Sequence, residues 1–322
     1  IPMYIIIGAW GGPNRVYAAF KFFLYTLLGS LLTLVAIIYL YTQSGSFSIP
    51  DWHQLPLSMR EQTLIFFAFL AAFAVKVPMW PVHTWLPDAH VEAPTGGSVV
   101  LAAIMLKLGA YGMMRVALPL FPERFYYFSV EVPIITVMAL MSIVYGALVC
   151  LAQWDLKRLV AYSSVAHMGY VTLGLVAAAA AWHGLSGSDG GMFDAAAAGL
   201  NGAALQQFSH GIVTGAMFFL VGMIYQRTHT RELKAFGGLA SVVPTYYGIT
   251  MVIAFASLGH SPEVVAEVFD EVRAAVEAKC PITWEDTGLD RIVDWAWGPT
   301  KIGRAALEAM CVRGDLVIHH RD

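Results

Sequence analysis

The sequence predicts an all-α, polytopic membrane protein with about seven transmembrane helices, an N-terminal stub and a small soluble tail. Hydrophobic residues make up 58% of the chain and charged residues only 13%, and the mean hydropathy is +0.63. An ordinary soluble domain of this size is less apolar. Apolar segments of about 20 residues, the length that spans a ~30 Å hydrocarbon core, recur between short polar stretches.

The expected membrane segments follow one another from the first residue. The stub covers 1–11, and the spans are 19–41, 63–81, 97–120, 132–152, 157–181, 199–225 and 240–259. The loops on one side of the membrane carry Arg15, Lys157, Arg158, Arg227, Arg231 and Lys234, and those on the other side carry Arg60 and Arg124. Because cytoplasmic loops hold an excess of Lys and Arg, the first side is expected to be cytoplasmic, together with the connection 82–96.

Lys76 is an ionisable residue inside the apolar run 64–81. A charge at the bilayer centre costs about 2.5–3.5 kcal/mol, and such residues usually mark ion or proton pathways. Pro78 and Pro81 each remove a backbone donor, so the helix should break beside Lys76, which is a common layout of transport sites. The alternative is a lysine that snorkels to the interface from a helix end.

Two further titratable residues lie deep in predicted spans. Lys107 is about 12 residues from either end of the segment 95–120, or about 18 Å at 1.5 Å per residue, which is close to the midplane. His210 lies within 199–225, and imidazole changes its charge nearest physiological pH. The structural alternatives are a lysine paired with a carboxylate for packing and a histidine that hydrogen-bonds between helices. With Lys76, the two residues predict a lateral proton relay.

The connection 82–96 contains His83, Asp88, His90 and Glu92. Two histidines and two carboxylates close together suggest a metal site, but their spacing matches neither a zinc site nor a facial triad, so no metal is expected. These side chains are expected to cap the broken helix or to admit protons from the cytoplasm.

Two other loops place charged residues at helix ends. They are Asp155, Lys157 and Arg158 in the first loop, and Arg227, His229 and Arg231 in the second. An acid at a helix start and cations at a helix end are favoured by the helix dipole, so a structural role is expected. Contact with neighbouring subunits or lipid headgroups is a further interpretation.

Three extended motifs give the chain a family resemblance. They are AVKVPMWPVHTWLPDAHVEAPTGGSVVLAAIMLKLGAYGMMR, DLKRLVAYSSVAHMGY and QRTHTRELKAFGGL. Over residues 1–259 the sequence resembles the proton-translocating membrane subunits, of the subunit M type, that belong to NADH-quinone oxidoreductase (respiratory complex I). The Mrp-type cation/proton antiporter subunits, which share the fold, are the alternative.

This resemblance implies an antiporter-like fold of two inverted repeats, each with one discontinuous helix. It makes Lys76 the lysine of the discontinuous helix, Lys107 the central lysine and His210 the histidine that links two half-channels. It implies a translocase subunit without a redox centre, with NADH, FMN, iron-sulfur clusters and quinone bound in partner subunits. The implied partners are other membrane and peripheral subunits of complex I, in the lipid bilayer of a bacterial cytoplasmic membrane.

The sequence departs from the family pattern at both ends. The family's glutamate partner of Lys76 precedes the position at which this chain begins, so the chain is expected to be a fragment. At the other end, the family's Leu-Pro-Gly continuation of the second discontinuous helix is replaced by HSPEVVAEVF. Residues 1–260 are therefore expected to form a partial antiporter-like domain.

Residues 261–322 are expected to form a separate soluble domain, because the net charge is +2 over 1–260 and −5 over 261–322. The segment 261–279 has the apolar spacing of an amphipathic helix, and helix, turn, helix and strand are expected across 284–322. The run KIGRAALEAMCVRGDLV loosely resembles the recognition helix and wing strand of a winged-helix DNA glycosylase domain, although the negative charge argues against DNA binding. A chimeric or misassembled tail is the preferred interpretation. The alternative is a truncated membrane anchor that carries a nucleic-acid-interaction tail.

Overall fold

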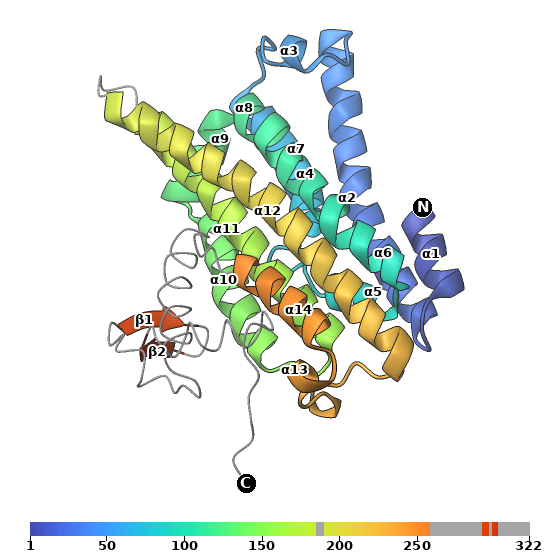
Figure 1. Ribbon diagram of the computed structural model, residues 1–322. Coiled ribbons are helices and arrows are strands. Elements are labelled where there is room, and N and C mark those ends of the chain that lie inside the picture. Colours follow the sequence, from blue (N-terminus) through green and yellow to red (C-terminus); the bar gives the residue numbers. More distant parts are fainter. Residues whose placement is uncertain (185–189, 258–291, 296–297, 302–322) are drawn as a thin grey trace. The chain divides into compact units, whose positions relative to one another are not determined.

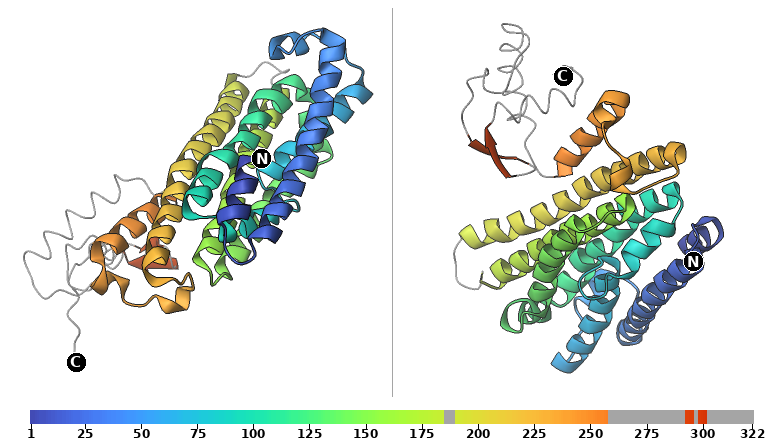
Figure 2. Two further views of the ribbon diagram at one scale, coloured as in Figure 1. Left: turned by 90° about the vertical axis from the view of Figure 1, so that its right-hand side faces the viewer. Right: turned by 90° about the horizontal axis from the view of Figure 1, so that it is seen from below.

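The computed structural model describes residues 1–184, 190–257, 292–295 and 298–301. The chain divides into two compact units, Ile1–Leu233 and Lys234–Asp322. The first unit is a bundle of helices, and its long helices run alongside one another (Figures 1 and 2).

The first half of the bundle contains the predicted helix break. Its helices are α1 (Pro2–Trp10), α2 (Arg15–Ser44), α3 (Ile49–Trp52), α4 (Met59–Lys76) and α5 (Trp85–Glu92). The stub α1 packs on α2, and α2 packs on both α4 and α5. No helix joins α4 to α5, so the chain is interrupted immediately after Lys76.

The next helical segment runs without a gap from Thr95 to Leu120. It consists of α6 (Thr95–Val100), η1 (Leu101–Met105), α7 (Leu106–Gly112), η2 (Met113–Ala117) and α8 (Leu118–Leu120). The turns η1 and η2 are π-helical and flank the helix that carries Lys107. Single π-helical turns inside α-helices often occur at functional sites.

The second half of the bundle contains the longest of the described helices, α12 (Gly190–Thr228). The helices of this half are α9 (Pro122–Tyr126), η3 (Tyr127–Glu131), α10 (Ile134–Leu151), α11 (Leu156–Gly184) and α12, followed by the 3₁₀ turn η5 (Leu233–Ala235). Helix α11 packs between α10 and α12, and α12 also packs on α6 and η1. This arrangement brings α12 against the segment that contains Lys107.

Five helices in the described part of the chain are long and apolar enough to cross a membrane. They are Arg15–Ser44, Thr95–Leu120, Ile134–Leu151, Leu156–His183 and Phe193–Thr228. They coincide with five of the predicted spans, which confirms the all-α membrane fold class. The predicted span 63–81 becomes α4, which carries Arg60, Glu61 and Lys76 and ends at the break.

An aromatic cluster packs α4 against the segment that follows α8. Phe66 of α4 stacks on Phe128, with ring centroids 5.7 Å apart, and meets Phe121 and Phe125 edge-on. Phe66, Phe121 and Phe125 are fully buried or nearly so. These contacts hold the first half of the broken helix against the second half of the bundle.

The second unit contains α13 (Leu239–Val242), α14 (Pro244–Ser257) and an antiparallel pair of strands, β1 (Ile292–Trp295) and β2 (Gly298–Lys301). The predicted span 240–259 falls on α13 and α14. The strand pair, in which Val293 lies opposite Thr300, replaces the helix and turn expected before residue 301. Ile292, Val293 and Trp295 are β-branched or aromatic, and such residues favour strands. The remainder of the predicted winged-helix-like segment lies outside the described residues.

Candidate functional site

Lys107 lies at the centre of a polar contact between two membrane-spanning segments. Its Nζ donates a hydrogen bond to the carbonyl oxygen of Ala102 at 2.6 Å and lies 2.7 Å from Nδ1 of His210 on α12. An ammonium group has only donors, so a charged Lys107 requires that Nδ1 of His210 carry no proton. The two side chains can therefore share or exchange one proton directly.

A glycine on α12 permits this contact. A Cβ at Gly211 would lie 3.0 Å from the Ala103 carbonyl oxygen and 3.5 Å from Cε of Lys107. Any side chain there would push α12 away from the Lys107 segment. His210 precedes this glycine and is only 4% exposed, and its Nε2 is buried without a hydrogen-bond partner among the described residues. That second nitrogen remains available for an onward proton transfer.

A second histidine extends the contact, and the sequence analysis overlooked it. His167 on α11 lies beside His210, with ring centroids 5.5 Å apart, and its Nδ1 is 3.1 Å from Nε2 of Gln206. The signal was available, because His167 is a titratable residue within the predicted span 157–181. Three neighbouring segments thus contribute Lys107, His210 and His167 to one cluster.

Lys76 is the last residue of α4, and the helix break directly after it is satisfied by side chains. The indole Nε1 of Trp85 donates to the carbonyl oxygen of Val75 at 3.0 Å, and the backbone N–H of Trp80 donates to Oγ of Ser142 at 2.8 Å. Broken helices persist inside membrane proteins only when such partners replace the lost backbone bonds. Pro78 and Pro81 lie in this interruption, as predicted.

The surroundings of Lys76 are open. The residue lines a cavity of about 390 Å³ together with side chains of α1, α2 and the Lys107 segment, including Met3, Thr26 and Met105. No hydrogen bond or ion pair links Nζ of Lys76 to another residue in the ranges that the structure describes. The two lysines of the predicted relay therefore have different environments, although their helices α4 and α7 are in contact.

Asp88 and His83, which were predicted to cap the broken helix or to admit protons, contact residues outside α5. Asp88 accepts a hydrogen bond from Lys21 at 2.7 Å and forms a longer ion pair of 3.6 Å with Arg158. His83 is 2% exposed beside the rings of Tyr145 and Tyr162. Neither ring nitrogen of His83 has a hydrogen-bond partner within the described ranges.

His90 and Glu92 occupy separate positions at the far end of α5. His90 is fully buried, and its ring stacks on Phe218 with centroids 4.2 Å apart. The carboxylate of Glu92 accepts a hydrogen bond at 3.0 Å from the backbone N–H of Asn14, the residue at the start of α2. Across the described ranges, no three His, Cys, Asp or Glu side chains are grouped to hold a metal ion.

Two cations bind the carbonyl groups at the C-terminal end of α5. Nζ of Lys157 donates to the Ala93 carbonyl oxygen, and Nη1 of Arg231 donates to that of Val91, each at 2.6 Å. Arg231 also pairs with Asp155 at 3.2 Å. We call this arrangement the carbonyl clamp. Cations stabilise the unpaired carbonyls at a helix C-terminus, so the clamp fixes the second half of the broken helix.

The remaining predicted loop residues lie at the ends of α11 and α12. Asp155 accepts a hydrogen bond from the backbone N–H of Arg158 at 3.0 Å, which caps the start of α11. His229 adopts a left-handed backbone with a φ of 53°, and its N–H donates to Tyr225 at 2.8 Å. Arg227 and His229 are exposed.

Comparison with known families identifies the kind of protein that carries this site. A family model described as NADH:quinone oxidoreductase/Mrp antiporter, TM, matches residues 1–188 and 190–268. The chain belongs to this family. The match includes every residue of the lysine–histidine cluster and of the carbonyl clamp.

Individual members of the family agree with this assignment. The chain is 50% identical over 273 residues to NADH-quinone oxidoreductase subunit M of Rhodobacter capsulatus, which covers 80% of this chain and 49% of the relative. It is 45% identical over 259 residues to NADH-ubiquinone oxidoreductase chain 4 of Marchantia polymorpha, covering 80% and 48% respectively. This chain thus spans about half the length of these relatives.

A solved structure supports the membrane fold. The chain superimposes on a chain of respiratory complex I from Thermus thermophilus with bound NADH, with a TM-score of 0.71 and 31% sequence identity. The similarity covers 80% of this chain and 51% of the other. The two chains therefore share their fold over this part.

Proposed function

We propose that this chain acts in a proton-translocating membrane subunit of a respiratory NADH:quinone oxidoreductase. Protons pass through it by a relay that includes Lys76, Lys107 and His210. The observation that carries the proposal is the 2.7 Å contact between Nζ of Lys107 and Nδ1 of His210 inside two membrane-spanning segments. An ionisable residue within a span is usually functional, and two such residues in direct contact form a proton-transfer pair.

The same geometry gives His167 a part in the relay. Its ring lies beside that of His210, and the two histidines stand on adjacent helices, α11 and α12. A proton leaving Nε2 of His210 needs only a short side-chain or water-mediated step to reach it. His83 and Asp88 belong to the connection that is expected on the cytoplasmic side, and they are proposed to admit protons from that side.

The redox reaction belongs to partner subunits in this proposal. NADH, FMN, iron-sulfur clusters and quinone bind there, and conformational or electrostatic coupling drives the relay. The partners are the other membrane and peripheral subunits of complex I, and the location is the cytoplasmic membrane of a bacterium. Similarity to the named relatives of the complex I type supports these assignments.

The test uses membrane vesicles that contain the chain assembled with its partner subunits. NADH oxidation and vesicle acidification are measured together for the wild type and for Lys107→Met. We expect the variant to lose most NADH-driven proton transport, because the ammonium group that exchanges a proton with His210 is absent. Arg227→Met, which alters an exposed cation near a helix end, is the matched control.

The same vesicles separate this function from cation/proton exchange. If a sodium gradient drives proton movement through the chain while NADH does not, the chain acts as an Mrp-type antiporter subunit instead. If Lys107→Met assembles and acidifies the vesicles at the wild-type rate, the relay is wrong.

A further inference from the structure

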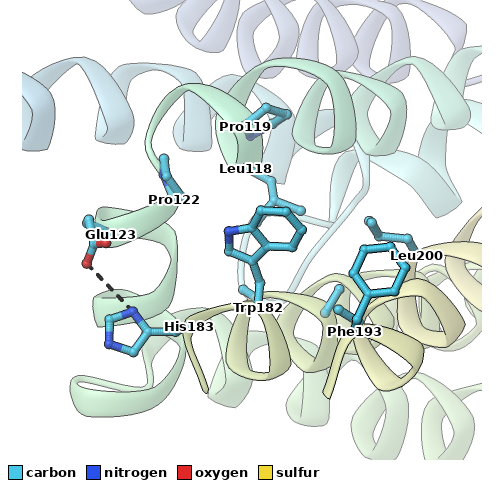
Figure 3. Close-up of a pocket in the computed structure, with 11 residues that line it drawn as sticks. Leu118, Pro119, Pro122, Glu123, Trp182, His183, Phe193 and Leu200 are labelled. Atoms are coloured by element: carbon cyan, nitrogen blue, oxygen red, sulfur yellow. Dashed lines mark ion pairs between the residues drawn. The ribbon is translucent and has the colours of Figure 1, made fainter. Parts of the chain in front are cut away.

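A large apolar pocket lies at the end of the first unit opposite the carbonyl clamp. Lys157 stands at the start of α11, whereas Trp182 and His183 stand at its other end and line the pocket. The pocket has a volume of about 780 Å³ between α8, α9, α11 and α12 (Figure 3). Leu118, Pro119 and Leu200 contribute to its apolar walls.

The rim of the pocket has the composition of a membrane interface. Trp182 and Phe193 line the pocket and are 58% and 55% exposed. Both lie at helix ends, on either side of residues 185–189. Aromatic side chains are enriched where lipid headgroups meet the hydrocarbon core. The pocket therefore opens at the depth where a lipid molecule places its polar head and the first part of its acyl chain.

A carboxylate and an imidazole stand at one side of the pocket. The Glu123 carboxylate lies 3.7 Å from Nδ1 of His183 (Figure 3). The His183 ring also stacks on Tyr126, with ring centroids 3.8 Å apart. The Glu123 carboxylate and the His183 ring are 63% and 43% exposed, so a ligand can reach both.

We propose that this pocket binds a zwitterionic phospholipid with an ethanolamine headgroup. An acyl chain fills the apolar part between Leu118, Phe193 and Leu200. The lipid ammonium group donates hydrogen bonds to the Glu123 carboxylate, and its phosphate lies toward the imidazole of His183. A headgroup that carries an ammonium group complements the Glu123 carboxylate better than a purely anionic headgroup does. The binding is independent of the proton relay.

The test is photolabelling of the full chain in nanodiscs. Two probes are compared that carry the same photoreactive acyl chain, one with an ethanolamine headgroup and one with a choline headgroup. Labelled peptides are identified by mass spectrometry. We expect label on the segments 118–123 and 178–200, stronger with the ethanolamine probe, because choline has no N–H donor for Glu123.

Paired variants separate the headgroup from the acyl chain. Glu123→Gln should lower labelling by the ethanolamine probe about three- to fivefold, the effect of losing one exposed ionic contact, and should lower labelling by the choline probe less, because choline is attracted to Glu123 by its charge alone. Phe193→Ser should lower labelling by both probes. Glu131→Gln and Phe208→Ser change exposed residues of the same types outside the pocket and should change neither.

Three results would overturn the proposal. They are equal labelling by both probes in the wild type, unchanged ethanolamine labelling in Glu123→Gln, and no label on either pocket segment. The last result would indicate that a protein segment rather than a lipid covers the pocket. Because Glu123, Glu131, Phe193 and Phe208 are all exposed, these variants should fold like the wild type.

Discussion

Lys76 and Lys107 are the same residue type in contacting helices, but the structure holds them differently. Lys107 lies in a continuous helical segment, where its ammonium group is within 2.7 Å of two acceptors, the Ala102 carbonyl oxygen and Nδ1 of His210. Lys76 lies at a helix end beside a cavity of about 390 Å³. A lysine inside a packed helix is limited to the partners that neighbouring helices present, whereas one at a break has space to move. In the proposed relay we therefore expect Lys107 to make a fixed exchange step with His210, and Lys76 to act in a separate step.

The strongest test of this difference is a double-mutant cycle on NADH-driven proton transport. Lys107→Met and His210→Gln should each lower the transport rate about a hundredfold, the usual contribution of a positioned acid or base. The double variant should be no slower than either single variant, because both substitutions remove the same contact. Vesicle acidification at matched complex content measures the rates.

The matched cycle pairs His210→Gln with Lys76→Met. Within the described ranges, no hydrogen bond, ion pair or ring contact joins these two residues. Their effects on the free energy of unfolding should therefore add, whereas those of Lys107→Met and His210→Gln should not. If the two pairs give the same interaction energy in unfolding, Lys76 and Lys107 do not differ in their contact with His210.

The carbonyl clamp offers a second test, because it holds the C-terminal end of α5 rather than the Lys107 contact. Arg231→Met removes the donor to the Val91 carbonyl and the partner of Asp155. We expect a loss of about 2–3 kcal/mol in unfolding free energy, as for a hydrogen bond to a charged group that leaves a buried acceptor unpaired. Thermal unfolding in detergent measures the loss.

Hydrogen exchange shows where the effect of the clamp lies. In Arg231→Met, amide exchange should accelerate over 82–93 and stay unchanged over 101–112. Arg227→Met, at an exposed position near the same helix end, should change stability by less than about 0.5 kcal/mol. Equal acceleration in both segments would show that the clamp supports the whole bundle.

Gly109 provides a smaller test, because it sets how closely the helices of the two lysines approach. A Cβ at this position would lie 2.8 Å from Cβ of Lys76 and 3.0 Å from the backbone nitrogen of Val77. Gly109→Ala should destabilise the protein by about 1–3 kcal/mol, since backbone atoms must shift to make room. Gly202→Ala is the control, because no atom lies within 4 Å of its added Cβ. Similar unfolding temperatures for the two variants would contradict the close packing.

The sequence predicted the features that depend on one segment at a time. Apolar length located five spans, and the prolines after Lys76 located the helix break. Because Lys107 and His210 lie deep within predicted spans, the sequence identified both as candidates for one proton relay. Each of these inferences needs only hydropathy, proline chemistry and the rise of a helix.

The features that depend on how helices rotate against one another were not predictable in this way. The position of His167 within a predicted span could be read from the sequence, but its proximity to His210 could not, because that depends on the packing of α11 on α12. The carbonyl clamp was not expected, since Arg231 reaches a carbonyl 140 positions earlier in the chain. A helix, a turn, a helix and a strand were expected across 284–322, but Ile292–Trp295 and Gly298–Lys301 pair as antiparallel strands, and Ile292 and Val293 are β-branched.

The smallest expected effect concerns the start of α4, at the end of that helix opposite Lys76. Glu61 precedes the predicted span, and hydrogen bonds from the hydroxyls of Ser58 and Tyr39 and from the Ser58 backbone N–H lower its pKa from 4.5 to about 2. These bonds favour the carboxylate in the folded protein, so their stabilisation is present above pH 4.5 and is lost as the pH falls toward 2.

The unfolding temperature of Glu61→Gln in detergent should therefore differ most from that of the wild type near neutral pH, and the two temperatures should converge under acid. Glu131→Gln should show no such convergence, and a constant difference between Glu61→Gln and the wild type from pH 5 to about 2 would contradict the capping contact. Because Glu61 is exposed, its effect should be small. The position of Lys76 should depend more on the carbonyl clamp at the C-terminal end of α5 than on the Glu61 cap at the start of α4.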